Sequence, residues 1–166
     1  MVNQKNMLIA AMITAGAVIS FFLFFQSDAT KIKKEFNTLA KKIDKQADES
    51  DLIGAAAANQ IEKMFGKSIR IEIPSYSVDK TFPHNEISPH VLYARSQYIE
   101  MKMKFYDFQI HFPQEGSAVV ALTAVFKATT ISNERVDEIH EAECTLEKIE
   151  DKWLFTGIRG VEVLER

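Results

Sequence analysis

Three side chains on predicted strands could perform acid–base chemistry. Asp107 and His111 lie four residues apart on one strand, and His140 lies on a later strand. Abstraction of a proton beside a carbonyl group needs such a base, together with a donor aimed at the developing oxyanion. A phenol could be that donor, and the sequence contains four tyrosines: Tyr76, Tyr93, Tyr98 and Tyr106.

The strand patterns place these candidates on different faces. The face opposite Asp107 and His111 carries the large apolar side chains of their strand, so we expect these two residues to point to solvent or to a subunit interface. His140 alternates in phase with small apolar side chains, which predicts that it points inward, as a base or as a hydrogen-bonded histidine at the core or rim. We therefore expect no convergent catalytic set.

Other site chemistry is not indicated by the sequence. Cys144 is expected to be a small buried hydrophobe, because Glu141 and Glu143 oppose formation of a thiolate. His84 and His90 do not have a metal-binding pattern around them. The sequence has no glycine-rich phosphate loop, no nucleophile elbow and no zinc-binding spacing. We expect neither a metal nor a cofactor.

Length and composition indicate one folded domain. The chain has 166 residues, of which 46% are hydrophobic and 26% charged, so it is not disordered throughout. A net charge of -3 and a pI near 5.8 give no basic footprint, so nucleic acid is not an expected partner. The single cysteine excludes an intramolecular disulfide framework.

The N-terminus contains an apolar segment, residues 7–25, with no charged side chain. As a helix it would reach about 28 Å, close to the hydrocarbon thickness of a bilayer. We predict a hydrophobic helix in residues 1–28 that anchors residues 29–166 to the cell membrane as a single-pass protein. The alternative is a signal segment cleaved near Ser27–Ala29, which would give a secreted or periplasmic protein. We expect the domain outside the cytoplasm, although lysines after the segment favour the opposite side.

The remaining chain has the periodicity of an α+β domain. Helices are predicted at 29–47, 51–65 and 89–100, the last started by Ser88 and Pro89, and strands at 69–73, 102–112, 117–129, 135–149 and 153–164, with a loop at 75–87 and a bulge near 106–107. Short turns join the last four strands, which predicts an antiparallel meander. Its apolar face must be covered by the helices.

This order of elements resembles the nuclear transport factor 2-like superfamily, and so does the last hairpin, in which a charged turn at Asp151–Lys152 precedes Trp153. The resemblance covers residues 29–166. It implies a cystatin-like cone, in which a curved antiparallel sheet is packed on helices around a cavity, and possible formation of a homodimer through the sheet. On this basis we take four residues as candidates for the cavity lining: Tyr98, Phe126, His140 and Trp153.

The resemblance leaves three functions open, because this fold serves enzymes, transport adaptors and assembly subunits. The sequence favours a non-catalytic, membrane-associated domain that binds a protein partner or a small apolar ligand. The second hypothesis is a lyase or isomerase of small molecules that uses Asp107, His111 or His140 in an acid–base pair. The third is a structural subunit of a membrane-bound secretion or assembly complex.

Overall fold

A computed structural model describes residues 28–74 and 77–161 of the chain. The chain divides into two compact units, residues 1–34 and 35–166. The predicted membrane segment lies outside the described residues. Among the residues that are described, no helix is long and apolar enough to cross a membrane.

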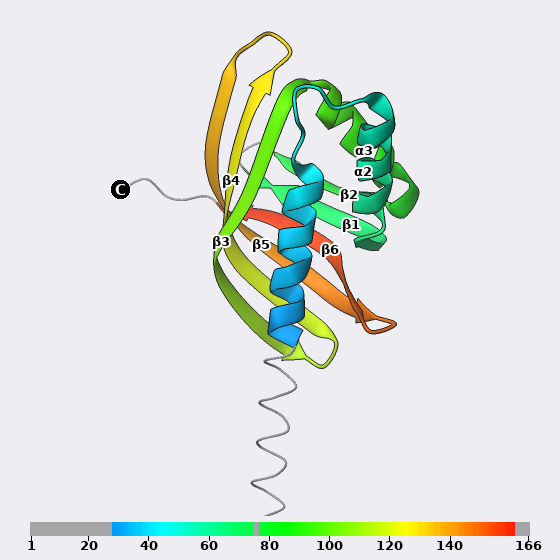
Figure 1. Cartoon of the computed structure of the whole chain (residues 1–166). Coiled ribbons are helices and arrows are strands. Elements are labelled where there is room, and N and C mark those ends of the chain that lie inside the picture. Colours follow the sequence, from blue (N-terminus) through cyan, green and yellow to red (C-terminus); the bar gives the residue numbers. More distant parts are fainter. Residues whose placement is uncertain (1–27, 75–76, 162–166) are drawn as a thin grey trace, which may run out of the picture. The chain divides into compact units, whose positions relative to one another are not determined.

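The second unit is an α+β domain, as predicted (Figure 1). The first helix of the described chain covers residues 28–43, of which residues 35–43 belong to the second unit. The other elements are α2 (Asp51–Glu62), β1 (Phe65–Ile73), β2 (Val78–Pro83), α3 (His84–Ser96), β3 (Tyr98–Gln114), β4 (Ser117–Thr130), β5 (Arg135–Ile149) and β6 (Lys152–Val161). Together the strands form one six-stranded sheet in the order β2-β1-β6-β5-β4-β3.

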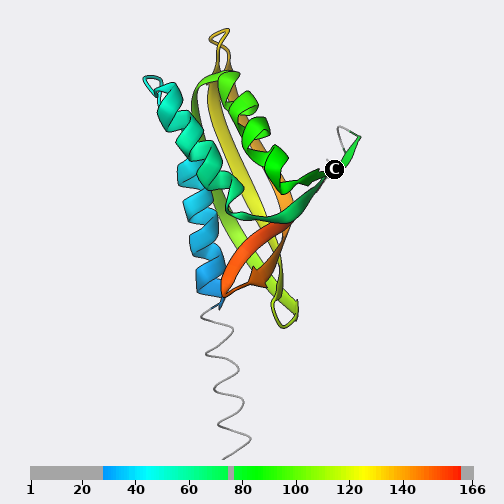
Figure 2. The same cartoon turned by 90° about the vertical axis from the view of Figure 1, so that its right-hand side faces the viewer.

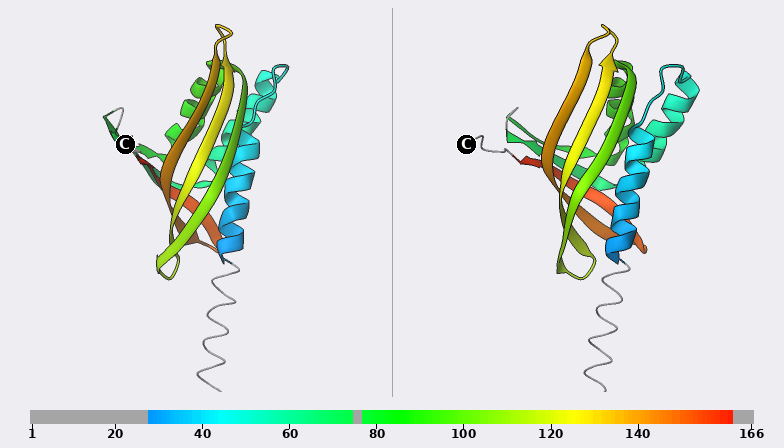
Figure 3. Two further views of the ribbon diagram at one scale, coloured as in Figure 1. Left: turned by 90° about the vertical axis from the view of Figure 1, so that its left-hand side faces the viewer. Right: turned by 60° about the vertical axis from the view of Figure 1, so that its left-hand side comes forward.

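The sheet contains the predicted meander and one pairing that was not predicted. Strands β3 to β6 are antiparallel neighbours in chain order, which confirms the meander. Strand β1 runs parallel to β6, with Ile71 opposite Ile158, and pairs with β2 as an antiparallel hairpin. The sheet curves around one side, where α2, α3 and residues 35–43 lie (Figures 2 and 3).

The predicted bulge in β3 is confirmed and has a clear role in the core. The β3–β4 register shifts after Tyr106, and Asp107 takes a φ of 57°, which a short polar side chain tolerates. Residues three apart on a regular strand point to opposite faces, but the extra residue lets both Phe105 and Phe108 face inward. Both rings contact Phe36 edge-on, with centroids 5.3 Å apart.

The predicted loop at 75–87 and the helix start at Ser88 were wrong. Strand β2 occupies part of this range, and α3 begins at His84, directly after Pro83. Ser88 is buried inside α3, where its hydroxyl donates a hydrogen bond to the amide oxygen of Asn59 on α2 at 2.9 Å instead of capping a helix. Pro89 therefore sits within the helix.

Three predicted helix ends were too late. The first helix ends at residue 43. The next carbonyl, that of Asp44, accepts from Arg95 on α3, and the Lys45 amide donates to the Met101 carbonyl of β3, so neither group continues the helix. Helix α2 ends at Glu62, and β1 already begins at Phe65, which lies opposite Phe155 of β6. Helix α3 ends at Ser96, and β3 begins two residues later.

Candidate functional site

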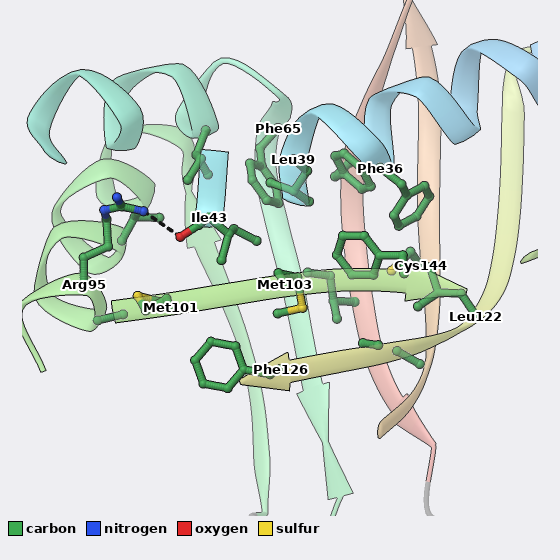
Figure 4. Close-up of a pocket in the computed structure, with 18 residues that line it drawn as sticks. Phe36, Leu39, Ile43, Phe65, Arg95, Met101, Met103, Leu122, Phe126 and Cys144 are labelled. Carbon is green, nitrogen blue, oxygen red and sulfur yellow. Dashed lines mark hydrogen bonds between the residues drawn. The ribbon is translucent and has the colours of Figure 1, made fainter. Parts of the chain in front are cut away.

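A cavity of about 370 Å³ lies between the inner face of the sheet and the helices (Figure 4). This volume is in the usual range for small-molecule sites. The side chains that form it are mainly aliphatic and aromatic. Arg95 and Cys144 are the only ionisable residues among the described side chains that line it.

The repeat patterns of the elements explain why the cavity is apolar. The first helix contributes Phe36, Leu39 and Ile43, which are three and four residues apart and so share one face. Strands β3, β4 and β5 contribute alternate residues, which point to the same side of the sheet. Two of these, Ala124 and Ala142, are small and leave room on the sheet beneath the helices.

Arg95 lies at one end of the cavity, where both of its terminal guanidinium nitrogens have hydrogen-bond acceptors. The side chain is 4% exposed, and its guanidinium donates hydrogen bonds to the carbonyl oxygens of Lys42, Ile43 and Asp44 at 3.0, 2.8 and 3.3 Å. It also contacts both carboxylate oxygens of Glu49 at 2.6 and 2.7 Å. Figure 4 shows the guanidinium directed toward the Ile43 carbonyl. The residue therefore caps the first helix and neutralises Glu49.

Cys144 contributes a thiol that remains protonated. Burial raises its pKa to about 12, and the negative charge of Glu143 acts in the same direction. The expectation of a small buried hydrophobe is confirmed. Across residues 28–74 and 77–161, no group of three or more histidine, cysteine, aspartate or glutamate side chains could hold a metal ion.

A histidine–carboxylate pair lies on the face of the sheet that lines the cavity, although neither residue is part of the lining. His140 lies directly opposite Ala124 in the β4–β5 ladder, and Glu138 lies opposite Phe126. Both β4 residues line the cavity, and directly opposite residues of an antiparallel pair project from the same face. His140 Nε2 and Glu138 Oε2 are 3.0 Å apart, with the two side chains 55% and 49% exposed. The pair is therefore exposed to solvent and lies beside residues that line the apolar cavity.

The contact with Glu138 fixes the tautomer of neutral His140. A carboxylate only accepts hydrogen bonds, so Nε2 carries the proton and Nδ1 has the lone pair. A histidine held in this way is a suitable general base, and the carboxylate stabilises the imidazolium that forms. Sequence reasoning singled out His140 but missed Glu138. The available signal was their spacing of two residues on one strand.

Asp107 and His111 do not meet His140. Asp107 lies in the β3 bulge, where its carboxylate accepts a hydrogen bond from the Thr123 hydroxyl at 3.0 Å. His111 is exposed and lies opposite Val119 on the face of the sheet away from the cavity. Neither residue lines the cavity.

The four candidates for the cavity lining are only partly brought together. Phe126 lines the cavity, and the Tyr98 ring packs edge-on against it with centroids 5.5 Å apart. His140 lies beside the lining, as described above. Trp153 is buried against Phe112, with centroids 6.0 Å apart, and is not part of the cavity lining.

Comparison with known proteins identifies the fold. No family model and no curated protein matches the chain. Similar solved structures include a candidate aromatic ring hydroxylase from Novosphingobium aromaticivorans, with a TM-score of 0.69 and 9% identity over 84% of this chain and 91% of that one. A hexachlorocyclohexane dehydrochlorinase, LinA type 2, has a TM-score of 0.66 and 10% identity over 84% and 87%.

A candidate scytalone dehydratase from Novosphingobium aromaticivorans has a TM-score of 0.63 and 13% identity over 82% of this chain and 86% of that one. At these identities the similarity concerns the fold alone. It agrees with the observed curved sheet, its covering helices and the cavity between them. The domain therefore has a nuclear transport factor 2-like cone fold.

Proposed function

We propose that this chain is a lyase or isomerase that holds a small apolar molecule in the cavity and removes a proton from it with His140. The observation that carries this proposal is the position of the His140–Glu138 pair. It lies on the cavity face of the sheet, directly opposite the lining residues Ala124 and Phe126.

The proposed step begins with neutral His140. Its Nδ1 takes a proton from a C–H group of the bound molecule, and Glu138 stabilises the resulting imidazolium through Nε2. In a lyase reaction the C–H electron pair forms a new double bond, and a leaving group departs from the next atom with its own bonding pair. In an isomerase reaction the imidazolium returns the proton to another carbon of the same molecule.

The names of two similar structures support this reaction class. A dehydrochlorinase removes hydrogen chloride and a dehydratase removes water, and both are eliminations that need a base. Their identities of 10% and 13% do not carry over individual residues to this chain. The support for His140 therefore comes from its own geometry.

A generic elimination substrate tests the proposal without knowledge of the natural one. A base that removes one C–H proton from nitrobenzisoxazole breaks the N–O bond and releases a coloured cyanonitrophenolate. We expect the full chain to open this ring faster than the same concentration of free imidazole. His140→Ala should lose the excess rate, since general-base catalysis typically contributes about 100-fold or more, and Glu138→Gln should reduce it.

His111→Ala is the matched control, because His111 is also an exposed strand histidine but projects from the opposite face of the sheet. It should leave the rate unchanged. Equal effects of the two histidine variants, or a rate no higher than that of imidazole, would contradict the proposed reaction.

A second candidate function is binding without catalysis. It is favoured by the cavity lining, in which the described residues include no aspartate, glutamate, histidine or tyrosine. In that case N-phenylnaphthylamine, a neutral fluorescent probe of apolar sites, would bind equally well to the native chain and to His140→Ala, without any ring-opening activity in either. Attachment to a membrane through residues 7–25, a protein partner and a homodimer through the sheet remain predictions.

A further inference from the structure

A second, smaller cavity adjoins the first. It has a volume of about 230 Å³ and lies between α3 and the hairpin of β1 and β2. Four residues line both cavities: Phe65, Val91, Ala94 and Ile158. The two spaces are therefore separated by a single layer of apolar side chains.

Ala94 is the smallest part of this wall. It is exposed and borders both cavities, and its methyl group takes up the least space in the wall. Val91, one helical turn earlier on α3, is also small and half-buried. Phe65 is held against Phe155, with ring centroids 5.5 Å apart. The passage between the cavities is therefore expected on the α3 side of the wall.

The smaller cavity is apolar except at one point. Its lining includes Ile69, Phe82 and Ile87, and the only polar side chain among the described lining residues is His90. The exposed His90 ring packs edge-on against Phe82, and its Nδ1 donates to the Glu86 carbonyl at 2.7 Å. Since a carbonyl only accepts, Nε2 of the neutral ring is left as an acceptor.

We propose that the ligand is an elongated apolar molecule that occupies both cavities and has one neutral polar end group, such as a hydroxyl, beside His90. Its larger part fills the first cavity, and its narrower part passes Ala94. This inference rests on one part of the proposed function, namely that the first cavity holds an apolar molecule. It adds the shape of that molecule and makes Ala94 a determinant of ligand length.

Straight-chain primary alcohols test the length requirement. Alcohols from hexanol to dodecanol would compete with N-phenylnaphthylamine for the full chain. Each added methylene that enters an apolar cavity should strengthen binding about fourfold. We expect this increase to continue to dodecanol in the native chain. In Ala94→Leu it should stop at a shorter alcohol, so that the ratio of dodecanol affinity to hexanol affinity falls.

Two further variants complete the test. Ala56→Leu adds the same side chain to an exposed position on α2 that lines neither cavity, and it should behave like the native chain. Val91→Ala removes bulk from the wall between the cavities and should strengthen the binding of dodecanol more than that of hexanol. The inference is overturned if Ala94→Leu leaves dodecanol binding intact or weakens hexanol and dodecanol equally. If Ala94→Leu leaves dodecanol binding intact, hexanol still binds as well, and the proposed function stands without this inference. If neither the probe nor any alcohol binds, both the inference and the proposed function are overturned.

Discussion

The buried ion pair between Arg95 and Glu49 should be a main determinant of the stability of the cavity end. The two side chains are 4% and 10% exposed, and Arg95 also holds three carbonyl groups at the end of the first helix. Arg95→Met is the informative change, because methionine keeps an apolar stem in the cavity wall and removes the guanidinium.

The cost follows from what the substitution leaves behind. Glu49 would become a buried carboxylate without a cation, and the carbonyl groups of residues 42–44 would lose their donors. Removing one partner of a buried pair typically costs about 3–5 kcal/mol. At about 3 °C per kcal/mol for a domain of this size, the melting temperature should fall by roughly 9–15 °C.

Removing both charges should be less harmful than removing one. Arg95→Met combined with Glu49→Leu leaves no buried charge, so we expect it to recover about 2 kcal/mol or more relative to Arg95→Met. The native pair is also incompletely satisfied, because Arg95 Nε has no acceptor among the described residues. The double variant removes this unsatisfied donor together with both charges, which favours the recovery of stability.

Urea unfolding of the full chain measures these differences. Trp153 is the only tryptophan and is 3% exposed, so its fluorescence should report loss of the core. Lys127→Met is the control, because it breaks an ion pair with Asp137 in which both side chains are about 60% exposed. Its cost should not exceed about 1 kcal/mol. If Arg95→Met cost no more than this control, or if the double variant lost the sum of the two single losses, the reasoning would be refuted.

Three other changes test the core and the sheet. Burial raises the pKa of Cys144 from 9.0 to about 12, so the folded chain holds this proton more tightly than the unfolded chain. The stability that this contributes is complete below pH 9 and is lost as the pH rises toward 12. In urea unfolding, the free energy of unfolding of Cys144→Ala should therefore fall less steeply with alkaline pH than that of the native chain. Gly157→Ala would place a Cβ 2.5 Å from the Thr145 hydroxyl oxygen and should cost about 1–3 kcal/mol, a loss that Thr145→Ala should reduce in the same unfolding assay. Phe36→Ala should cost about 3–5 kcal/mol by calorimetry, because this fully buried ring contacts three other phenylalanines.

The parts of the fold that were predicted correctly can each be recognised from the residues of one short segment of the sequence. Alternation of apolar and polar residues, β-branched composition and short turns identified the four strands of the meander, and a change of phase at Tyr106–Asp107 located the bulge. Each of these features depends on residues within one strand or on a short turn between two strands. Local spacing is therefore enough to find them.

The parts that were missed depend on contacts between distant segments. The parallel pairing of β1 with β6 joins residues such as Ile71 and Ile158, and such pairing leaves no local period in the sequence. Ser88 before a proline has the local pattern of a helix start, but its hydroxyl instead bonds to Asn59 on another helix. A tertiary hydrogen bond therefore overrode the local preference.

The composition of β5 explains why the candidate site lies where it does. Residues of one phase of this strand share a face, and under the helices they are Ala142, Cys144 and Leu146. The same phase continues to His140 and Glu138, which would be costly to bury and are half exposed. The change from apolar to ionisable side chains therefore marks the edge of the helical cover. At this edge an apolar molecule can lie in the cavity while the imidazole exchanges its proton with water, which a base must do between turnovers.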